Sequence, residues 1–247
     1  MRRRFIADTF SPATGHPTHA ALTGEQAAHL ARVLRAQPGQ VFDVVADGFL
    51  HRAEITSVSD PEVLFTLHEE LEADAALPIH LLLAVFKFDH FEWAIEKATE
   101  LGVAGIAPVI ARRTEKHLAQ AAEKRVERWR RIAHEAAQQS RRSDVPVIHD
   151  TRTLSASVAS ASGATRIVLA EQERTATLIE TVQRALAVVA ESVLDFQIAV
   201  GPEGGWAPEE EELFAANDWK AVTLGPRILR AETAAIAALS VFASLLD

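Results

Sequence analysis

Short apolar runs alternate with amphipathic helical patterns from Ile79 to the end of the chain. The run at 80–86 is followed by a helical pattern that begins at Asp89, and the same order recurs along the remaining residues. A crossover between two parallel strands needs a helix-length connection, so this alternation is typical of a parallel sheet covered on both faces. The sequence therefore predicts an α/β domain over residues 79–247.

Strands and helices within this domain are predicted from the period of the apolar residues and from capping residues. The predicted strands are 80–86, 105–110, 147–149, 166–170, 196–200 and 221–224. The predicted helices are 89–101, 123–139, 154–160, 178–189, 208–217 and 232–246. Gly102 is the expected end of the first helix, because glycine adopts the left-handed conformation that often follows a helix.

Residues 1–72 have a different, β-rich pattern. Two alternating runs, 41–45 and 50–58, flank Asp47-Gly48, and this dipeptide is a strong signal for a hairpin turn. A further strand is predicted at 63–67. These strands predict a small barrel-like β domain.

One helix is predicted inside this β domain. The residues Thr23-Gly24-Glu25-Gln26 have the pattern of a capping box, and Leu30, Val33 and Leu34 follow on one helical face. The boundary to the α/β domain is predicted in an alanine-rich linker at 73–78.

Composition excludes several classes of function. The chain has no cysteine, which removes disulfides, zinc-thiolate sites and thiol chemistry. Its longest apolar run, 234–246, is shorter than the ~20 residues that cross a bilayer, and no apolar signal-peptide core follows the first residues. The histidines have no metal-ligand spacing. We expect a soluble cytoplasmic protein with no metal and no membrane partner.

The charge distribution is uneven. The net charge of −9 argues mildly against a nucleic-acid partner. Residues 107–145, however, contain ten Lys and Arg against five acids, a local excess of five positive charges. This basic segment is compatible with RNA binding and equally typical of a solvated helix face.

Two loops carry most of the functional information. Gly201-Pro202-Glu203-Gly204-Gly205-Trp206 and the segment 224–233 each follow a predicted strand and lead into a predicted helix. Open α/β sheets bind ligands at the carboxyl ends of their strands. The glycines would let main chain approach a ligand closely, although a plain tight turn explains them equally well. The first loop has neither the P-loop nor the dinucleotide spacing, and no nucleophile elbow occurs.

The second loop places Arg227, Arg230 and Glu232 next to a helix start. A functional site is one interpretation. An ion pair of Arg230 with Glu232, or with an acid across the sheet, is the other.

Several motifs, in order along the whole chain, resemble the RsmE family of the SPOUT superfamily. They are Arg3-Arg4-Phe5, His29-Leu30 with Val33-Leu34-Arg35 and Gly39, Lys87, Glu96-Lys97, Glu100-Leu101-Gly102-Val103, Trp129 with Ile132, Glu135 with Gln139-Ser140-Arg141, Gly201-Pro202-Glu203-Gly204-Gly205, Leu224-Gly225, Arg227-Ile228-Leu229-Arg230 and Glu232-Thr233-Ala234. The resemblance implies an N-terminal PUA-like RNA-binding β-barrel and a C-terminal SPOUT α/β domain with a deep trefoil knot. It also implies a homodimer.

The activity implied by the resemblance is S-adenosylmethionine (SAM)-dependent methylation of a uridine N3 in the decoding region of 16S ribosomal RNA, on the assembled small subunit. The residues expected at the cofactor are Leu169, Ala170, Glu171, Gly201, Pro202, Glu203, Gly204, Gly205, Leu224, Gly225, Ile228, Leu229 and Thr233. The residues expected at the RNA are Arg2, Arg3, Arg4, Arg32, Arg35, Lys87, Arg141 and Arg142.

Arg230 and Glu232 are the expected catalytic residues. Uridine N3 must lose a proton to attack the methyl group, so a cation that stabilises negative charge at O2 or O4 lowers the barrier. We assign this role to Arg230, while Glu232 either accepts the proton or orients Arg230. The chain departs from the family pattern at Ala231 and at Phe88-Asp89-His90-Phe91. A non-catalytic RNA-binding relative and a SPOUT methyltransferase of another RNA are the alternatives.

Overall fold

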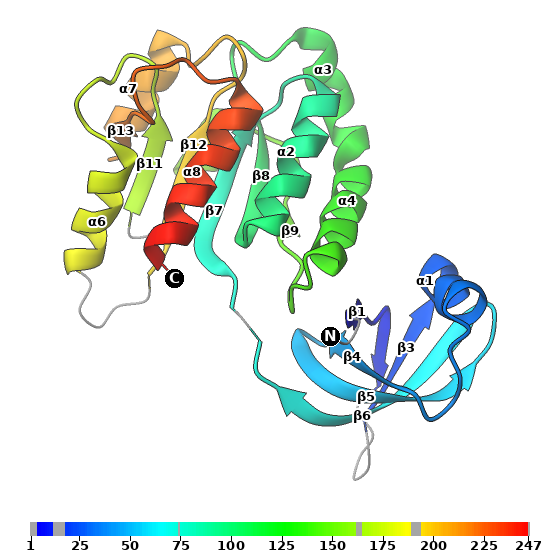
Figure 1. The fold of residues 1–247 in the computed structure, drawn as a ribbon. Helices are drawn as coiled ribbons and strands as arrows, with labels where there is room; N and C mark the ends of the chain where they lie inside the picture. The colour runs from blue at the N-terminus through cyan, green and yellow to red at the C-terminus, as the bar shows by residue number, and fades with distance from the viewer. Residues whose placement is uncertain (1–3, 12–17, 74, 162–164, 189–193, 247) are drawn as a thin grey trace. The chain divides into compact units, whose positions relative to one another are not determined.

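The computed structural model describes residues 4–11, 18–73, 75–161, 165–188 and 194–246 (Figure 1). Contacts within the chain divide it into two units, Met1–Ala75 with Ala137–Asp144, and Ala76–Ala136 with Val145–Asp247. We call these the first and the second unit and describe each by itself. Among the described residues, no helix combines the length and the apolar character that crossing a bilayer requires.

The first unit is built around a six-stranded sheet in the order β1-β4-β5-β6-β3-β2. Its strands are β1 (Arg4–Ile6), β2 (Thr9–Ser11), β3 (His19–Thr23), β4 (Val41–Ala46), β5 (Phe49–Val58) and β6 (Glu62–Leu71). β4 and β5 form the predicted antiparallel hairpin, and its turn residues Asp47 and Gly48 have φ of 52° and 82°. Two consecutive positive φ angles match the twist of the flanking strands, which is why this dipeptide predicts the hairpin correctly.

The helix of the first unit differs from the prediction in its cap and in its face. The helical residues are α1 (Gly24–Ala28) and a π-helical turn, η1 (His29–Val33). The Thr23 side chain does not cap α1, because its hydroxyl donates to Oδ2 of Asp8 over 3.1 Å. The wider π-helical turn shifts the face of the helix, so Leu30 is fully buried while Val33 is 66% exposed. The predicted capping box and the inward placement of Val33 are therefore wrong.

The second unit contains the predicted parallel sheet, in the order β10-β8-β7-β12-β11-β13 with β9 beside β8. Its strands are β7 (Leu77–Ala84), β8 (Val103–Ile110), β9 (Val147–Ile148), β10 (Arg152–Thr153), β11 (Thr165–Leu169), β12 (Phe196–Val200) and β13 (Lys220–Val222). Its helices are α2 (Phe88–Glu100), α3 (Lys116–Ala122), the 3-10 turn η2 (Glu123–Arg125), α4 (Val126–Gln139), α5 (Leu154–Ala159), α6 (Leu178–Val188), α7 (Pro208–Ala216) and α8 (Ala231–Leu246). The sequence did not predict β10 and α3.

Helices cover both faces of this sheet, as Figure 1 shows. Side chains alternate along β7, so that Leu81 and Leu83 belong to the core under α2, α4, α6 and α8. Leu82 and Ala84 belong to a second core, which α5 and α7 cover. Burial on both faces explains the unbroken apolar run from which this strand was predicted.

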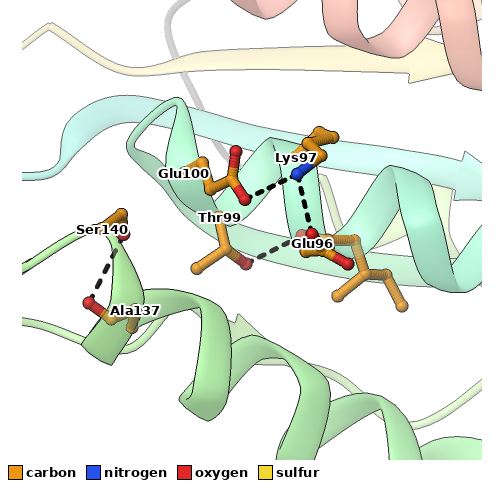
Figure 2. Close-up of polar contacts among 7 residues, drawn as sticks. Glu96, Lys97, Thr99, Glu100, Ala137 and Ser140 are labelled. Atoms are coloured by element: carbon orange, nitrogen blue, oxygen red, sulfur yellow. Dashed lines mark hydrogen bonds and ion pairs between the residues drawn. The ribbon is translucent and has the colours of Figure 1, made fainter.

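Helix α2 ends just before Gly102, as predicted. Lys97 on its surface donates to Glu96 and to Glu100, each over 2.7 Å (Figure 2). Gly102 has a φ of 92°, and a Cβ atom there would lie 3.2 Å from Cγ of Leu77. Glycine is the residue that fits this position without strain, and it lets β8 begin at the next residue.

Candidate functional site

A cleft lies at the carboxyl ends of β11, β12 and β13, at the upper edge of the sheet in Figure 1. Its wall comes from the loops that follow these three strands, from the start of α8 and from Arg113, which follows β8. We call it the loop cleft. Its volume, counting the part open to solvent, is about 830 Å³. Open α/β sheets bind ligands at the carboxyl ends of their strands, so the loop cleft lies where a ligand site is expected.

The glycine-rich loop after β12 is held against the loop after β11 by Trp206. The indole Nε1 donates to the carbonyl of Leu169 over 3.1 Å, and a Cβ atom at Gly201 would lie 3.2 Å from the indole ring. Gly205 has a φ of 68° and donates to the carbonyl of Pro202 over 2.8 Å. The loop is therefore a tight turn, and Gly201 and Gly205 also line the loop cleft. The two interpretations of the glycines are compatible.

A buried carboxylate anchors the far end of this loop. Glu210 in the first turn of α7 accepts the N–H of Ala207 over 2.9 Å and the N–H of Arg112 over 2.7 Å. The negative charge also lies at a helix N-terminus, which favours it. Arg113 donates to the carbonyl of Gly204 over 2.6 Å. These bonds fix the glycine-rich loop from the side of β8, before any ligand is bound.

The loop after β11 is ordered by Glu173. One oxygen of its carboxylate accepts the N–H groups of Thr175 over 2.7 Å and of Ala176 over 3.0 Å, and the Thr175 hydroxyl over 2.7 Å. Hydrogen bonds from the backbone of Ala176 and Thr175 lower the pKa of Glu173 to about 2. Its neighbours Gln172 and Arg174 line the loop cleft, so this carboxylate shapes one wall.

The loop after β13 supplies an apolar wall. Thr223 holds its turn, since its hydroxyl exchanges hydrogen bonds with the backbone of Gly225 over 3.0 and 3.1 Å. Leu224 and Leu229 are half-buried beside the cleft, and Ile228 is 74% exposed. An isoleucine side chain this exposed gains from cover by an apolar ligand surface.

Most residues predicted at the cofactor line the loop cleft. They are Leu169, Ala170, Glu171, Gly201, Gly205, Leu224, Gly225, Ile228 and Leu229. Four others lie outside its wall: Pro202 is buried, Glu203 and Gly204 are exposed, and Thr233 faces a different hollow.

The sequence missed other lining residues. Trp206 was readable as part of the glycine-rich loop, and Val222 and Thr223 as the end of a strand. Arg113 gave no signal, because it comes from the end of β8 and reaches the cleft only through the order of the strands.

A second hollow lies beside the loop cleft. It is lined by Asp89, His90, Trp93, Arg230, Glu232 and Thr233, and we call it the side hollow. Leu229 and Ala231 face the loop cleft, whereas Arg230 and Glu232 face the side hollow. One stretch of chain thus forms part of the wall of both spaces.

The two residues predicted to be catalytic have contrasting surroundings. Glu232 is 4% exposed, and its Oε1 lies 3.0 Å from Nδ1 of His90. The side chain of Arg230 is exposed and makes no hydrogen bond or ion pair within the described part of the chain. The alternative in which Arg230 is paired with Glu232 is therefore not seen. The contact of His90 with Glu232 was not predicted from the sequence. His90 does lie in Phe88-Asp89-His90-Phe91, a stretch that departs from the family pattern.

In the first unit, the predicted RNA-binding arginines have different environments. Arg4 donates to the carbonyl of Arg141. Arg32 is bound by Asp60, with 2.6 Å between Nε and Oδ1, and Arg35 is exposed. Arg2 and Arg3 lie outside the described residues. Asp60 neutralises Arg32, which weakens its attraction for phosphate.

Arg142 and Lys87 contrast in exposure. The side chain of Arg142 is 8% exposed, and its Nε lies 3.1 Å from Oδ1 of Asp144. This geometry does not favour direct contact with RNA. Lys87 is exposed at the start of α2.

Acids neutralise much of the basic segment 107–145. Glu92 binds Arg128 through two hydrogen bonds of 2.8 Å and Arg125 over 3.2 Å. Arg130 binds Asp150 over 2.8 Å. For these arginines, the interpretation as a solvated and internally paired helix face is the better one. The described residues also contain no cluster of His, Asp or Glu suited to a metal ion.

Comparison with known proteins identifies the family. A family model for an RNA methyltransferase domain matches residues 73–243, and a model for an RNA methyltransferase PUA domain matches 22–67. A Bacillus subtilis protein named ribosomal RNA small subunit methyltransferase E is 34% identical over 244 residues, which cover 97% of this chain and 95% of that protein. The chain belongs to this methyltransferase E family. Membership confirms the RsmE resemblance and makes the chain an RNA methyltransferase.

Solved structures agree with membership in the methyltransferase E family. A putative methyltransferase from Legionella pneumophila, crystallised with SAM, is 28% identical with a TM-score of 0.81. A ribosomal RNA small subunit methyltransferase E from Neisseria gonorrhoeae, also crystallised with SAM, is 27% identical with a TM-score of 0.81. Each match covers 99% of this chain and 98% of the other. The predicted α/β domain and the separate N-terminal β domain of PUA type are confirmed.

Proposed function

We propose that this enzyme uses SAM to methylate N3 of a uridine in the decoding region of 16S ribosomal RNA, on the assembled small subunit. The observation that carries the proposal is the loop cleft, because the loops assigned to the cofactor from sequence enclose it. The Legionella and Neisseria proteins of the same fold were crystallised with SAM. The name of the Neisseria and Bacillus proteins specifies small-subunit ribosomal RNA. The proposal implies action in the cytoplasm, where ribosomal subunits are found.

The residues of the loop cleft fit SAM. Gly201 and Gly205 leave main chain uncovered at the wall, where a nucleoside can lie against it. Leu224, Ile228 and Leu229 offer apolar surface for the adenine ring. When bound, SAM supplies a methyl group activated by the sulfonium.

The side hollow is the proposed place of the base, since it opens next to the loop cleft across Leu229 to Glu232. N3 of the base forms a bond to the methyl carbon while the carbon–sulfur bond breaks, and the N3 proton leaves to an acceptor. Arg230, which is exposed and unpaired among the described residues, stabilises the negative charge at O2 or O4. Glu232 is the proposed acceptor of the proton, with orientation of Arg230 as the alternative role.

We further propose the architecture that the family resemblance implies. Residues 1–72 would form an RNA-binding barrel, 73–78 a linker, and 79–247 a SPOUT domain tied in a deep trefoil knot. The enzyme would act as a homodimer through the knotted domain. Light scattering of the purified protein tests the last point, and a monomer mass at micromolar concentration would refute it.

Two experiments test the proposed activity. Calorimetry with SAM separates the enzyme from a non-catalytic RNA-binding relative, for which we would see no binding at high micromolar concentration. Methyl transfer is then compared on purified small subunits and on naked RNA from a strain that lacks the enzyme. We expect transfer to the subunits only. Equal transfer to naked RNA would contradict the assembled substrate, and transfer to transfer RNA alone would favour the other alternative.

A further inference from the structure

Glu232 needs a partner, because its carboxylate is buried at the edge of the side hollow. Its side chain is 6% exposed, and a charge that has lost water is costly unless hydrogen bonds replace it. The helix N-terminus of α8 favours a negative charge, but a specific donor is also required. Among the described residues, no Lys or Arg lies within ion-pair distance of Glu232.

His90 supplies that donor from another helix. Its Nδ1 lies 3.0 Å from Oε1 of Glu232, and it reaches across from the first turn of α2. An ionised carboxylate has no proton to give, so Nδ1 must carry the proton and donate it. The other ring nitrogen, Nε2, lies 3.7 Å from Oδ2 of Asp89. Asp89 is 79% exposed and lies near Nε2, so Nδ1 remains available to donate to Glu232.

The contact lies where it can influence the reaction. Ala231, next to Glu232, lines the loop cleft, whereas Glu232 and His90 both line the side hollow. The direction of the Glu232 carboxylate in this hollow therefore depends on His90. Among the described residues Glu232 is paired with His90 and not with Arg230, whose guanidinium is left for the substrate.

We propose that His90 is a positioning residue for methyl transfer, which holds the ionised Glu232 carboxylate toward the base in the side hollow. In this role His90 acts through Glu232. The inference rests on the proposed reaction at this site, but its readout counts methyl groups transferred to small-subunit RNA and does not depend on which atom receives them.

Two variants of His90 test this role. His90→Ala removes the donor, whereas His90→Asn places an amide N–H at the position of Nδ1, because both atoms lie three bonds from Cα. We expect His90→Ala to lower kcat by about tenfold or more while KM for the subunit and the Kd of SAM change by less than about twofold. We expect His90→Asn to recover most of kcat. A residue that only stabilises the fold would not give this rescue.

A matched control uses another histidine beside a carboxylate. His117 lies 3.5 Å from Glu115, is 72% exposed and is absent from both clefts. We expect His117→Ala to keep the wild-type kcat. A double-mutant cycle completes the test: in a Glu232→Gln background, His90→Ala should cost less than a further twofold, because the contact has already lost its acceptor charge.

The outcomes separate the inference from the proposed function. If wild-type enzyme transfers no methyl group to any small-subunit RNA, the proposed function fails and the inference falls with it. If wild type is active and His90→Ala loses no more kcat than His117→Ala, the inference alone is overturned. Equal losses in His90→Ala and His90→Asn, or a full additional loss in the Glu232→Gln background, also overturn it. If His90→Ala does not fold, the inference is tested with His90→Asn. Its kcat is compared with that of wild type, both in the presence and in the absence of Glu232→Gln.

Discussion

The loop cleft and the side hollow share one stretch of chain but are built in different ways. The loop cleft is shaped by backbone: glycines with fixed φ, and carbonyls and N–H groups held by Trp206, Glu210 and Glu173. The side hollow depends on side chains, with one buried carboxylate, one histidine and one unpaired arginine. A site made of backbone is rigid before its ligand arrives, whereas a site made of side chains can respond to its substrate. A rigid site suits the cofactor, which is the same in every turnover. A site that can respond suits a base that is part of an RNA chain.

The largest expected effect belongs to the side hollow. Arg230→Ala should lower kcat by roughly 10² or more, because a charge contact made to the reacting base is lost. The Kd of SAM should stay within about twofold of wild type, since Arg230 is outside the loop cleft. Single-turnover kinetics and calorimetry measure the two quantities. Arg184→Ala, an exposed arginine on α6, is the control. Unchanged turnover in Arg230→Ala would remove Arg230 from the mechanism.

A smaller effect is expected in the loop cleft, where a substitution should change the Kd of SAM. Gly205→Ala forces a side chain into a φ of 68°, which costs about 1–2 kcal/mol. If that strain is relieved by moving the loop, the Kd of SAM should rise about tenfold. Gly48→Ala imposes the same kind of strain at a φ of 82° in the hairpin of the first unit. It should lower the thermal midpoint without changing the Kd of SAM. If both variants bind SAM like wild type, the backbone of this loop does not shape the cofactor site.

The smallest effect is expected at Glu173. Glu173→Gln removes the charged acceptor of the loop after β11 and should weaken SAM binding by less than about tenfold. The sign of its pH dependence follows from the lowered pKa of about 2, against 4.5 for the free group. The charged form is favoured by the fold, so its contribution is complete above pH 4.5 and is lost as the pH falls toward 2. Calorimetry with SAM at neutral pH is the measurement. A Kd equal to that of wild type would show that this loop orders itself without the carboxylate.

The same contrast explains what could be predicted from the sequence. The parallel sheet was predictable because β7 and β12 are buried on both faces and are mainly apolar. The loops of the cleft were predictable because glycine and strand ends are local signals. The contact of His90 with Glu232 was not, because 142 residues separate the two and only the packing of α2 beside α8 brings them together.

Local signals also fail where a tertiary contact competes with them. Thr23 has the sequence pattern of a cap, yet its hydroxyl donates to Asp8, which lies between β1 and β2. Arg142 lies in a basic segment, yet its guanidinium donates a hydrogen bond to Asp144. In both cases the polar side chain is known from the sequence, but its hydrogen-bond partner is not. Several partners are possible locally, and the tertiary structure decides which one is within reach.

The most direct test of the account is the identity of the methylated nucleoside. Small subunits from a strain without this enzyme are incubated with the purified protein and SAM labelled in the methyl group, and the RNA is digested to nucleosides and resolved by mass spectrometry. We expect label in 3-methyluridine, from a single position in the decoding region of 16S RNA. Label in any other nucleoside, or no label in small-subunit RNA, would contradict it.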